Sequence, residues 1–143
     1  MIESIPFGNS RSRGVAGVVV TPLSGWSYPM VQSSPGETYA TLVRVKSADD
    51  KIRQEAVAFA LSKSIKGQGY DWNVWQKSVY QPGYYCSELI WAAYYKASKG
   101  KINLGNKLTG GWRDKIVGVW PDDIMSDTAN TQIVGYHWEH NPL

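Results

Sequence analysis

The stretch that decides the fold is "YYCSELIWAAYY", residues 84–95, which holds the only cysteine of the 143-residue chain. A glycine-containing turn, "YQPGYY", precedes Cys86, and an apolar repeat follows it. This pattern predicts a helix from about Cys86 to Ser98, ended by Gly100. We therefore expect Cys86 at a helix N-terminus, and the function of the chain depends on whether its thiol is buried or reactive.

The residues alone support two interpretations of Cys86. Free cysteine is among the most buried residue types, and Cys86 shares a predicted apolar face with Leu89, Ile90, Ala93 and Ala97. Against this, a thiolate at a helix N-terminus is stabilised by the helix dipole and by amides that have no partner within the helix. The backbone amide of the cysteine would also lie beside an oxyanion formed next to the sulfur. The first interpretation predicts a core residue and the second a nucleophile.

Composition narrows the class of protein. A hydrophobic fraction of 43% and a charged fraction of 19% are typical of one soluble globular domain, which we expect to span residues 1–143. The chain has seven Trp and nine Tyr but two Phe. Trp and Tyr are amphipathic, so they suit either a core or a cleft that binds sugars or peptides. A net charge of +3 without a basic run argues against a nucleic-acid partner.

Several other classes of site and segment are not expected. One cysteine excludes an internal disulfide, and the sequence has neither a zinc-type cluster nor a phosphate-binding Gly-rich motif. The N-terminal residues lack the basic start and apolar run of a signal peptide. The stretch "GVAGVVV" is too short to cross a bilayer, so we expect no transmembrane segment.

Elsewhere the pattern predicts a mixture of strands and helices. A helix is expected to begin with Ser47 and Asp50 as a capping pair, to bury an apolar face, and to stop at Gly67. A short helical turn is expected at "PDDIM", with proline first. The predicted strands are residues 14–23, 38–46, 114–120 and 131–138.

Three motifs together resemble a known family. They are the dipeptide Tyr70-Asp71, the box "YCSEL" at residues 85–89, and "PDDI" at residues 121–124. This combination is similar to the papain-like amidases of the NlpC kind, and specifically to their circularly permuted, YiiX-type branch. The resemblance covers most of the chain, and the cysteine box is its specific part. It implies an α+β fold of the papain-like type, with a small antiparallel sheet packed against the cysteine-bearing helix.

The resemblance also implies an activity. Members of this family are thiol hydrolases (cysteine peptidases or amidases) that cleave amide bonds, typically in cell-wall peptides, and they need no metal or organic cofactor. It implies Cys86 as nucleophile, a peptide or peptidoglycan-like substrate, and a location in the cell envelope or outside the cell. Tyr70, Tyr84 and Tyr85 are candidates to line the substrate groove or to donate to an oxyanion, with packing in the core or at its rim as the alternative.

Two further functions remain open on the same fold. An acyltransferase or lipid hydrolase would show an apolar trough beside Cys86. A wall-binding or peptide-binding module without a base would show an unreactive thiol. The first would act on thioesters or lipid esters, and the second would bind its ligand tightly without reacting.

The general base is the point at which the sequence departs from the family. A thiol amidase needs a base to deprotonate the sulfur and to protonate the leaving amine. In the permuted branch the histidine precedes the cysteine, whereas no histidine precedes Cys86 here. The start "MIESIP" resembles the segment after the family's histidine strand, so we expect that strand, with the base, upstream of Met1. If the chain supplies its own base, the candidate is His137 in "IVGYHW" rather than His140; the alternative is that both lie on a surface tail.

The acidic residues near these motifs are expected to have structural roles. Glu88 falls in the first turn of the cysteine helix, where an acid favours the dipole. Asp71 is expected to make a turn hydrogen bond. Asp122 and Asp123 follow Pro121 and are expected to place negative charge at the N-terminus of a helix, where it is favourable, rather than to bind a metal.

Overall fold

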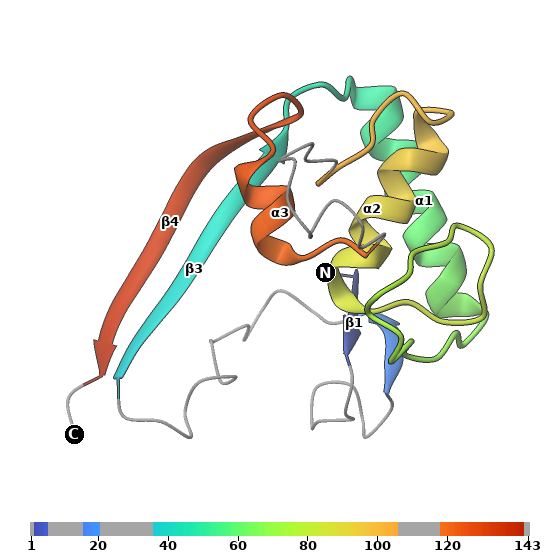
Figure 1. Ribbon diagram of the computed structural model, residues 1–143, viewed down its shortest axis with the longest axis horizontal. Coiled ribbons are helices and arrows are strands. Elements are labelled where there is room, and N and C mark those ends of the chain that lie inside the picture. Colours follow the sequence, from blue (N-terminus) through green and yellow to red (C-terminus); the bar gives the residue numbers. More distant parts are fainter. Residues whose placement is uncertain (1, 6–15, 21–35, 106–117, 142–143) are drawn as a thin grey trace.

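The chain has an α+β fold in which helices and strands occupy different parts of the molecule (Figure 1). The computed structural model describes residues 2–5, 16–20, 36–105 and 118–141. The elements of these ranges, in chain order, are β1 (Ile2–Ile5), β2 (Gly17–Val20), β3 (Gly36–Val45), α1 (Asp50–Ile65), α2 (Cys86–Ala97), α3 (Pro121–Ser126) and β4 (Thr131–Asn141). The predicted α+β class is confirmed.

The strands pair as two separate antiparallel ribbons among the described residues, β1 with β2 and β3 with β4. In the longer ribbon, the register shifts between Leu42 and Val43, where Val134 has no paired residue opposite it. Strand β1 was not predicted, because four residues are too few for an alternating pattern to be recognised. Of the predicted strand at 114–120, residues 114–117 lie outside the described ranges, and residues 118–120 do not form a strand.

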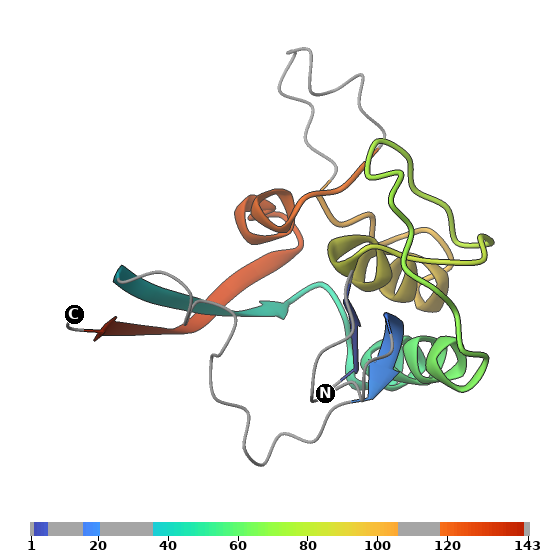
Figure 2. The ribbon, with the colours of Figure 1, turned by 90° about the horizontal axis from the view of Figure 1, so that it is seen from below.

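The two longer helices lie side by side and form the body of the molecule (Figures 1 and 2). The ribbon of β1 and β2 packs against both of them, so the cysteine-bearing helix does contact a small antiparallel ribbon. The ribbon of β3 and β4 contacts α3 through β4 and places Val45 of β3 in the core, while its far end extends away from the helices in both views. The C-terminal half of β4 is therefore remote from the helical layer.

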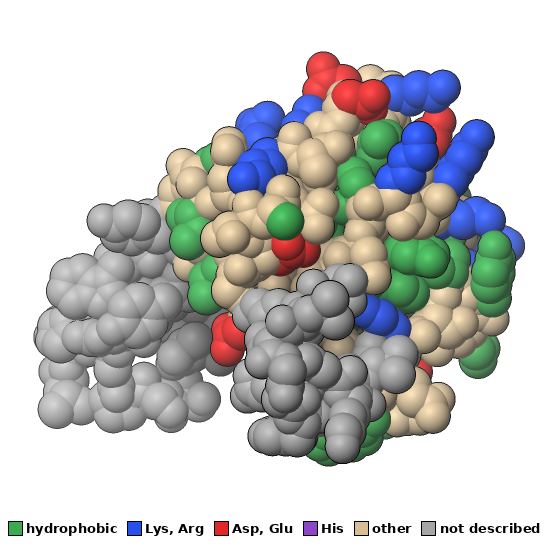
Figure 3. All heavy atoms as spheres, turned by 45° about the horizontal axis from the view of Figure 1, so that its top comes forward, with side chains coloured by type: hydrophobic (Ala, Val, Ile, Leu, Met, Phe, Trp, Pro, Cys, Tyr) green, Lys and Arg blue, Asp and Glu red, His purple; other side chains and the backbone are tan. Residues whose placement is uncertain are grey.

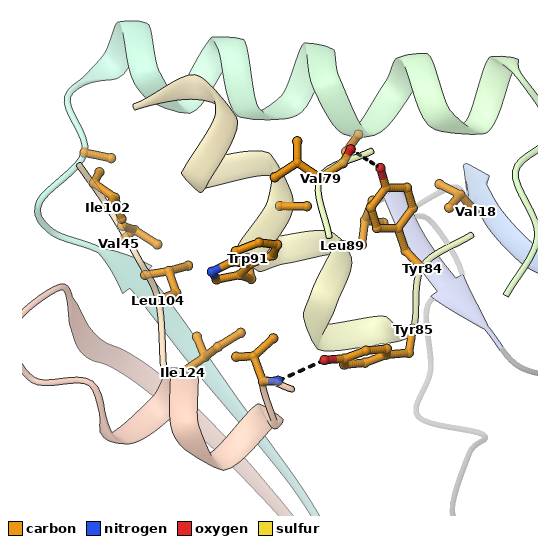
Figure 4. Close-up of a cluster of buried hydrophobic side chains, with 14 residues drawn as sticks. Val18, Val45, Val79, Tyr84, Tyr85, Leu89, Trp91, Ile102, Leu104 and Ile124 are labelled. Atoms are coloured by element: carbon orange, nitrogen blue, oxygen red, sulfur yellow. Dashed lines mark hydrogen bonds between the residues drawn. The ribbon is translucent and has the colours of Figure 1, made fainter. Parts of the chain in front are cut away.

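The core lies around α2 (Figure 4). Residues 87–89 and 91–93 of α2 are buried. The buried side chains around them come from β2, β3, α3 and the loops on either side of α2; examples are Val18, Val45, Val79, Ile102, Leu104, Val119 and Ile124. The predicted apolar face is only partly right. Leu89 and Ala93 are buried, but Ile90 is 46% exposed and Cys86 is exposed.

Helix α1 begins at a different cap from the predicted one. Asp49 is the N-cap residue, and its Oδ1 accepts a hydrogen bond of 2.8 Å from the backbone N–H of Ile52. Ser47 instead donates its hydroxyl to the side-chain oxygen of Asn130 at 3.0 Å. The predicted stop is confirmed, because α1 ends at Ile65 and Gly67 has a φ of 62°, a conformation that favours glycine.

On the face shown in Figure 3, the charged side chains of the described residues are scattered. In the view of Figure 3, lysine and arginine side chains lie along the upper and right-hand parts of the molecule, interleaved with acidic and apolar side chains. Within the described ranges, none of the helices is both long enough and apolar enough to cross a bilayer.

Candidate active site

The thiol of Cys86 lies at the surface, on the first residue of α2. The three residues that follow it, Ser87, Glu88 and Leu89, are buried at 3% exposure or less. The thiol is therefore the one side chain of the first turn that solvent reaches. A cysteine held in the core would have packed inward with Leu89, so the interpretation of Cys86 as a buried hydrophobe is wrong.

The start of α2 is held in place by buried contacts to two distant segments. Ser4 of β1 donates its hydroxyl to the backbone carbonyl of Tyr84. The segment just before α3 is bound twice: the N–H of Val119 donates to the Tyr85 hydroxyl at 2.9 Å, and Ser87 Oγ donates to the Val119 carbonyl at 2.7 Å. Because these partners come from both ends of the chain, the position of the thiol depends on the complete tertiary fold.

The loop before α2 closes on itself through two glycines. Gly69 and Gly83 form an isolated β-bridge, and the N–H of Tyr84 donates to the Gly69 carbonyl at 3.2 Å. A Cβ on Gly83 would lie 2.9 Å from that carbonyl oxygen, closer than Cβ contacts normally allow. The glycine in this turn is thus required by close backbone approach, and the closed loop carries Tyr70 to the start of α2.

Tyr70 is the predicted site residue that the structure brings to Cys86. The backbone N–H and the sulfur of Cys86 both lie near enough to the Tyr70 hydroxyl to influence its titration. Burial, and secondarily the nearby sulfur, raise the pKa of Tyr70 above its ordinary value of 10.0. The phenol therefore keeps its proton near neutral pH, and its O–H remains a hydrogen-bond donor beside the sulfur.

Tyr84 and Tyr85 are core residues. They are 0% and 3% exposed, and Figure 4 shows both rings among the buried side chains. The Tyr84 hydroxyl donates to the Val79 carbonyl at 2.7 Å, and burial raises the pKa of Tyr84 to about 12. Burial also raises the pKa of Tyr85, whose hydroxyl accepts a hydrogen bond from the backbone N–H of Val119. Neither ring is accessible to solvent, which agrees with the alternative of packing in the core, and their hydrogen bonds help to position the helix start.

Glu88 caps α2 from inside the core. It is the third residue of the helix, and its Oε2 accepts the backbone N–H of Tyr85 at 3.3 Å, which confirms the predicted first-turn role. Its Oε1 accepts the backbone N–H of Ser78 at 2.9 Å. The side chain is 0% exposed, and burial raises the pKa of Glu88 to about 7 even though these donors favour the carboxylate. Complete burial was not predicted.

Gln81 joins the loop to the helix, and sequence reasoning missed it. Its Nε2 donates to Glu88 Oε1 at 2.6 Å and to Asp71 Oδ2 at 3.0 Å. Asp71 also accepts the backbone N–H of Asn73 at 2.8 Å, which confirms the predicted turn role of this residue. No sequence signal could have identified Gln81, because its two partners meet only when the loop closes.

The two histidines considered as the base lie on β4. His137 pairs with Ala40, and His140 with Glu37, in the backbone register of β4 with β3. The side chains of these histidines lie outside the described residues, so the role of His137 as base stays a prediction.

The predicted turn at Pro121 is confirmed by α3, whose first turn holds Asp122 and Asp123. Asp123 Oδ2 accepts the backbone N–H of Trp120, as expected for a helix cap. In the described part of the chain, no three His, Cys, Asp or Glu side chains are grouped so that they could hold a metal ion.

Comparison with known proteins gives no relative for this chain: no protein-family model, no curated protein and no solved structure matches it.

Proposed function

We propose that this protein is a thiol amidase of the papain-like type, with Cys86 as its nucleophile and a peptide, most simply one from a cell wall, as its substrate. The observation that carries the proposal is the exposed thiol at the N-terminus of α2, with a protonated phenol beside it. Thiol nucleophiles need both access and a positive electrostatic environment, and a helix N-terminus supplies the second. The family resemblance of the "YCSEL" box supports the same reading.

The proposed reaction begins with attack of the thiolate on an amide carbonyl carbon. A C–S bond forms and the carbonyl π electrons move onto oxygen, which gives a tetrahedral oxyanion. The backbone N–H of Cys86 and the O–H of Tyr70 both lie near the sulfur and can donate to this oxygen. The C–N bond then breaks, and the nitrogen takes a proton from the general acid as the amine leaves.

Water completes the cycle by attacking the thioester. A second oxyanion forms at the same two donors, and its collapse releases the carboxylic acid and restores the thiol. Tyr84, Tyr85 and Glu88 contribute by fixing the start of α2 rather than by contact with the substrate. The proton-transfer steps need a base; if this chain supplies its own, the candidate is His137.

The proposal is tested by covalent chemistry at the single thiol. Iodoacetamide should alkylate Cys86 in the folded protein, and mass spectrometry after incubation with soluble cell-wall peptides should show cleavage of an amide bond. Cys86→Ser should abolish both reactions and change the free energy of unfolding little, because the side chain is exposed and the volumes are similar. A folded protein whose thiol resists iodoacetamide would contradict the proposal.

A further inference from the structure

We propose that Gln81 is a positioning residue for the Tyr70 hydroxyl, a role that rests on the proposed thiol chemistry at Cys86. Tyr70 immediately precedes Asp71 in the chain, and Cys86 lies two residues before Glu88. The Gln81 amide bridges these two carboxyl groups, at 3.0 Å to Asp71 and 2.6 Å to Glu88. One side chain therefore connects the loop that carries the phenol to the helix that carries the thiol.

The chemistry of the bridge explains why an amide stands at this position. The two carboxyl groups repel each other, and the charge of Asp71 contributes to the raised pKa of Glu88. The Nε2 group of Gln81 has two N–H bonds, and it directs one to each carboxyl group. An apolar side chain here would remove the donor that the two carboxyl groups share, which leaves Asp71 Oδ2 without this hydrogen bond and Glu88 Oε1 with the Ser78 N–H alone. The strand-like contact at Gly69 would still hold the start of the Tyr70 segment, but the direct link from Asp71 to the cysteine helix would be lost.

The proposed effect on catalysis is specific to one step. Acylation of the thiol passes through an oxyanion and needs the Tyr70 hydroxyl in place, whereas alkylation by iodoacetamide is a displacement at a saturated carbon that forms no oxyanion. Loss of one oxyanion donor typically slows a reaction by about a hundredfold to a thousandfold, and a displacement of about 1 Å costs on the order of a hundredfold. A positioning residue should therefore affect acylation and spare alkylation.

The experiment uses p-nitrophenyl acetate as the acyl donor. The sulfur forms a bond to the acetyl carbon, the bond to the aryl oxygen breaks, and p-nitrophenolate leaves and is measured by its absorbance. We expect Tyr70→Phe to slow this acylation by roughly a hundredfold and Gln81→Met by roughly tenfold or more. Alkylation by iodoacetamide should change by less than about twofold in both. Gln76→Met, an exposed glutamine on the same loop, is the matched control and should affect neither reaction.

A double variant distinguishes positioning from general damage. If Gln81 acts through the Tyr70 hydroxyl, Gln81→Met should have no further effect on acylation in the Tyr70→Phe background. Additive losses in the double variant, or a Gln81→Met protein whose alkylation slows by the same factor as its acylation, would overturn the role of Gln81. A wild-type protein that is alkylated but not acylated would overturn the proposed function itself. Should Gln81→Met fail to fold, Gln81→Asn keeps the amide but withdraws it by one methylene and is expected to show the same selective loss.

Discussion

Glu88 shows at the scale of one residue how burial and charge compete. Its carboxyl group accepts the backbone N–H groups of Ser78 and Tyr85 and the Gln81 amide, all of which favour the carboxylate. Lys77 adds a positive charge that interacts with it. Burial nevertheless dominates, because the side chain is 0% exposed and the desolvation cost of a charge exceeds what these partners return. A surface glutamate at the same helical position would have supplied the dipole interaction without this cost.

This balance predicts a dependence of stability on pH. The pKa of Glu88 rises from 4.5 to about 7 on folding, so the folded state binds the proton more tightly than the unfolded state does. The resulting stabilisation is fully present below pH 4.5 and is lost as the pH rises through about 7. Its full size corresponds to about 3 kcal/mol.

Denaturant titrations of the wild type and Glu88→Gln between pH 4.5 and 8 measure this term. We expect the wild type to lose stability relative to the variant by a few kcal/mol across the range. The variant is also expected to lose stability at every pH, because its amide nitrogen would face a backbone N–H that the carboxyl oxygen now accepts. A difference between the two proteins that stays constant with pH would show that Glu88 does not titrate in this range.

At the scale of elements, sequence reasoning succeeded where a local pattern decides the structure. Helix α2 begins at Cys86 as predicted and ends within one residue of the prediction, because an apolar repeat bounded by turn residues is a local signal. The helical turn at Pro121 was predicted from another local signal, proline at the first helical position. The choice of Asp49 over Ser47 as the cap of α1 was not, since both residue types are good caps and only the contact of Ser47 with Asn130, 83 positions away, separates them.

The features of the candidate site also divide into those set by neighbouring residues in the sequence and those set by tertiary contacts. The place of Cys86 at a helix start follows from its neighbours in the sequence, and so does the first-turn role of Glu88. The exposure of the Cys86 thiol does not follow from the sequence. The apolar spacing placed Cys86, Leu89, Ile90 and Ala93 on one buried face, but tertiary packing buries Leu89 and Ala93 and leaves Cys86 and Ile90 exposed. The proximity of the Tyr70 segment, Gln81 and Glu88 depends on closure of the loop, which cannot be predicted from hydrophobic periodicity.

The cap of α1 gives an element-scale prediction. Asp49→Ala removes the acceptor of the Ile52 N–H and should lower the free energy of unfolding by about 0.5–2 kcal/mol. Ser47→Ala is the matched control and should cost less than about 1 kcal/mol, because its hydroxyl makes an exposed side-chain contact and does not cap the helix. Urea unfolding followed by circular dichroism measures both. A larger loss for Ser47→Ala would restore the cap assignment that the sequence pattern predicts.

At the scale of the whole molecule, the position of the base depends on the ribbon of β3 and β4. The near end of β4 is fixed to α3, since Thr131 donates its hydroxyl to the Ile124 carbonyl at 2.9 Å. Val134 interrupts the pairing just beyond this anchor, and bulges of this kind bend a ribbon and increase its twist. The backbone of His137 lies past the bulge, on the half of β4 that extends away from the helices in Figures 1 and 2.

This arrangement favours a base other than His137 and gives the last prediction. We expect His137→Ala and His140→Ala to acylate with p-nitrophenyl acetate at the wild-type rate, because the far half of the ribbon is remote from α2. We also expect free imidazole to accelerate acylation of the wild type, since an added base can replace one that is missing. Cys86→Ser under the same conditions measures the direct reaction of imidazole with the ester and is subtracted. A rate lowered by a hundredfold or more in His137→Ala alone, with His140→Ala unaffected, would instead identify His137 as the general base. The ribbon would then have to bend at Val134 to bring the imidazole to the sulfur, and the added imidazole should restore the rate of that variant.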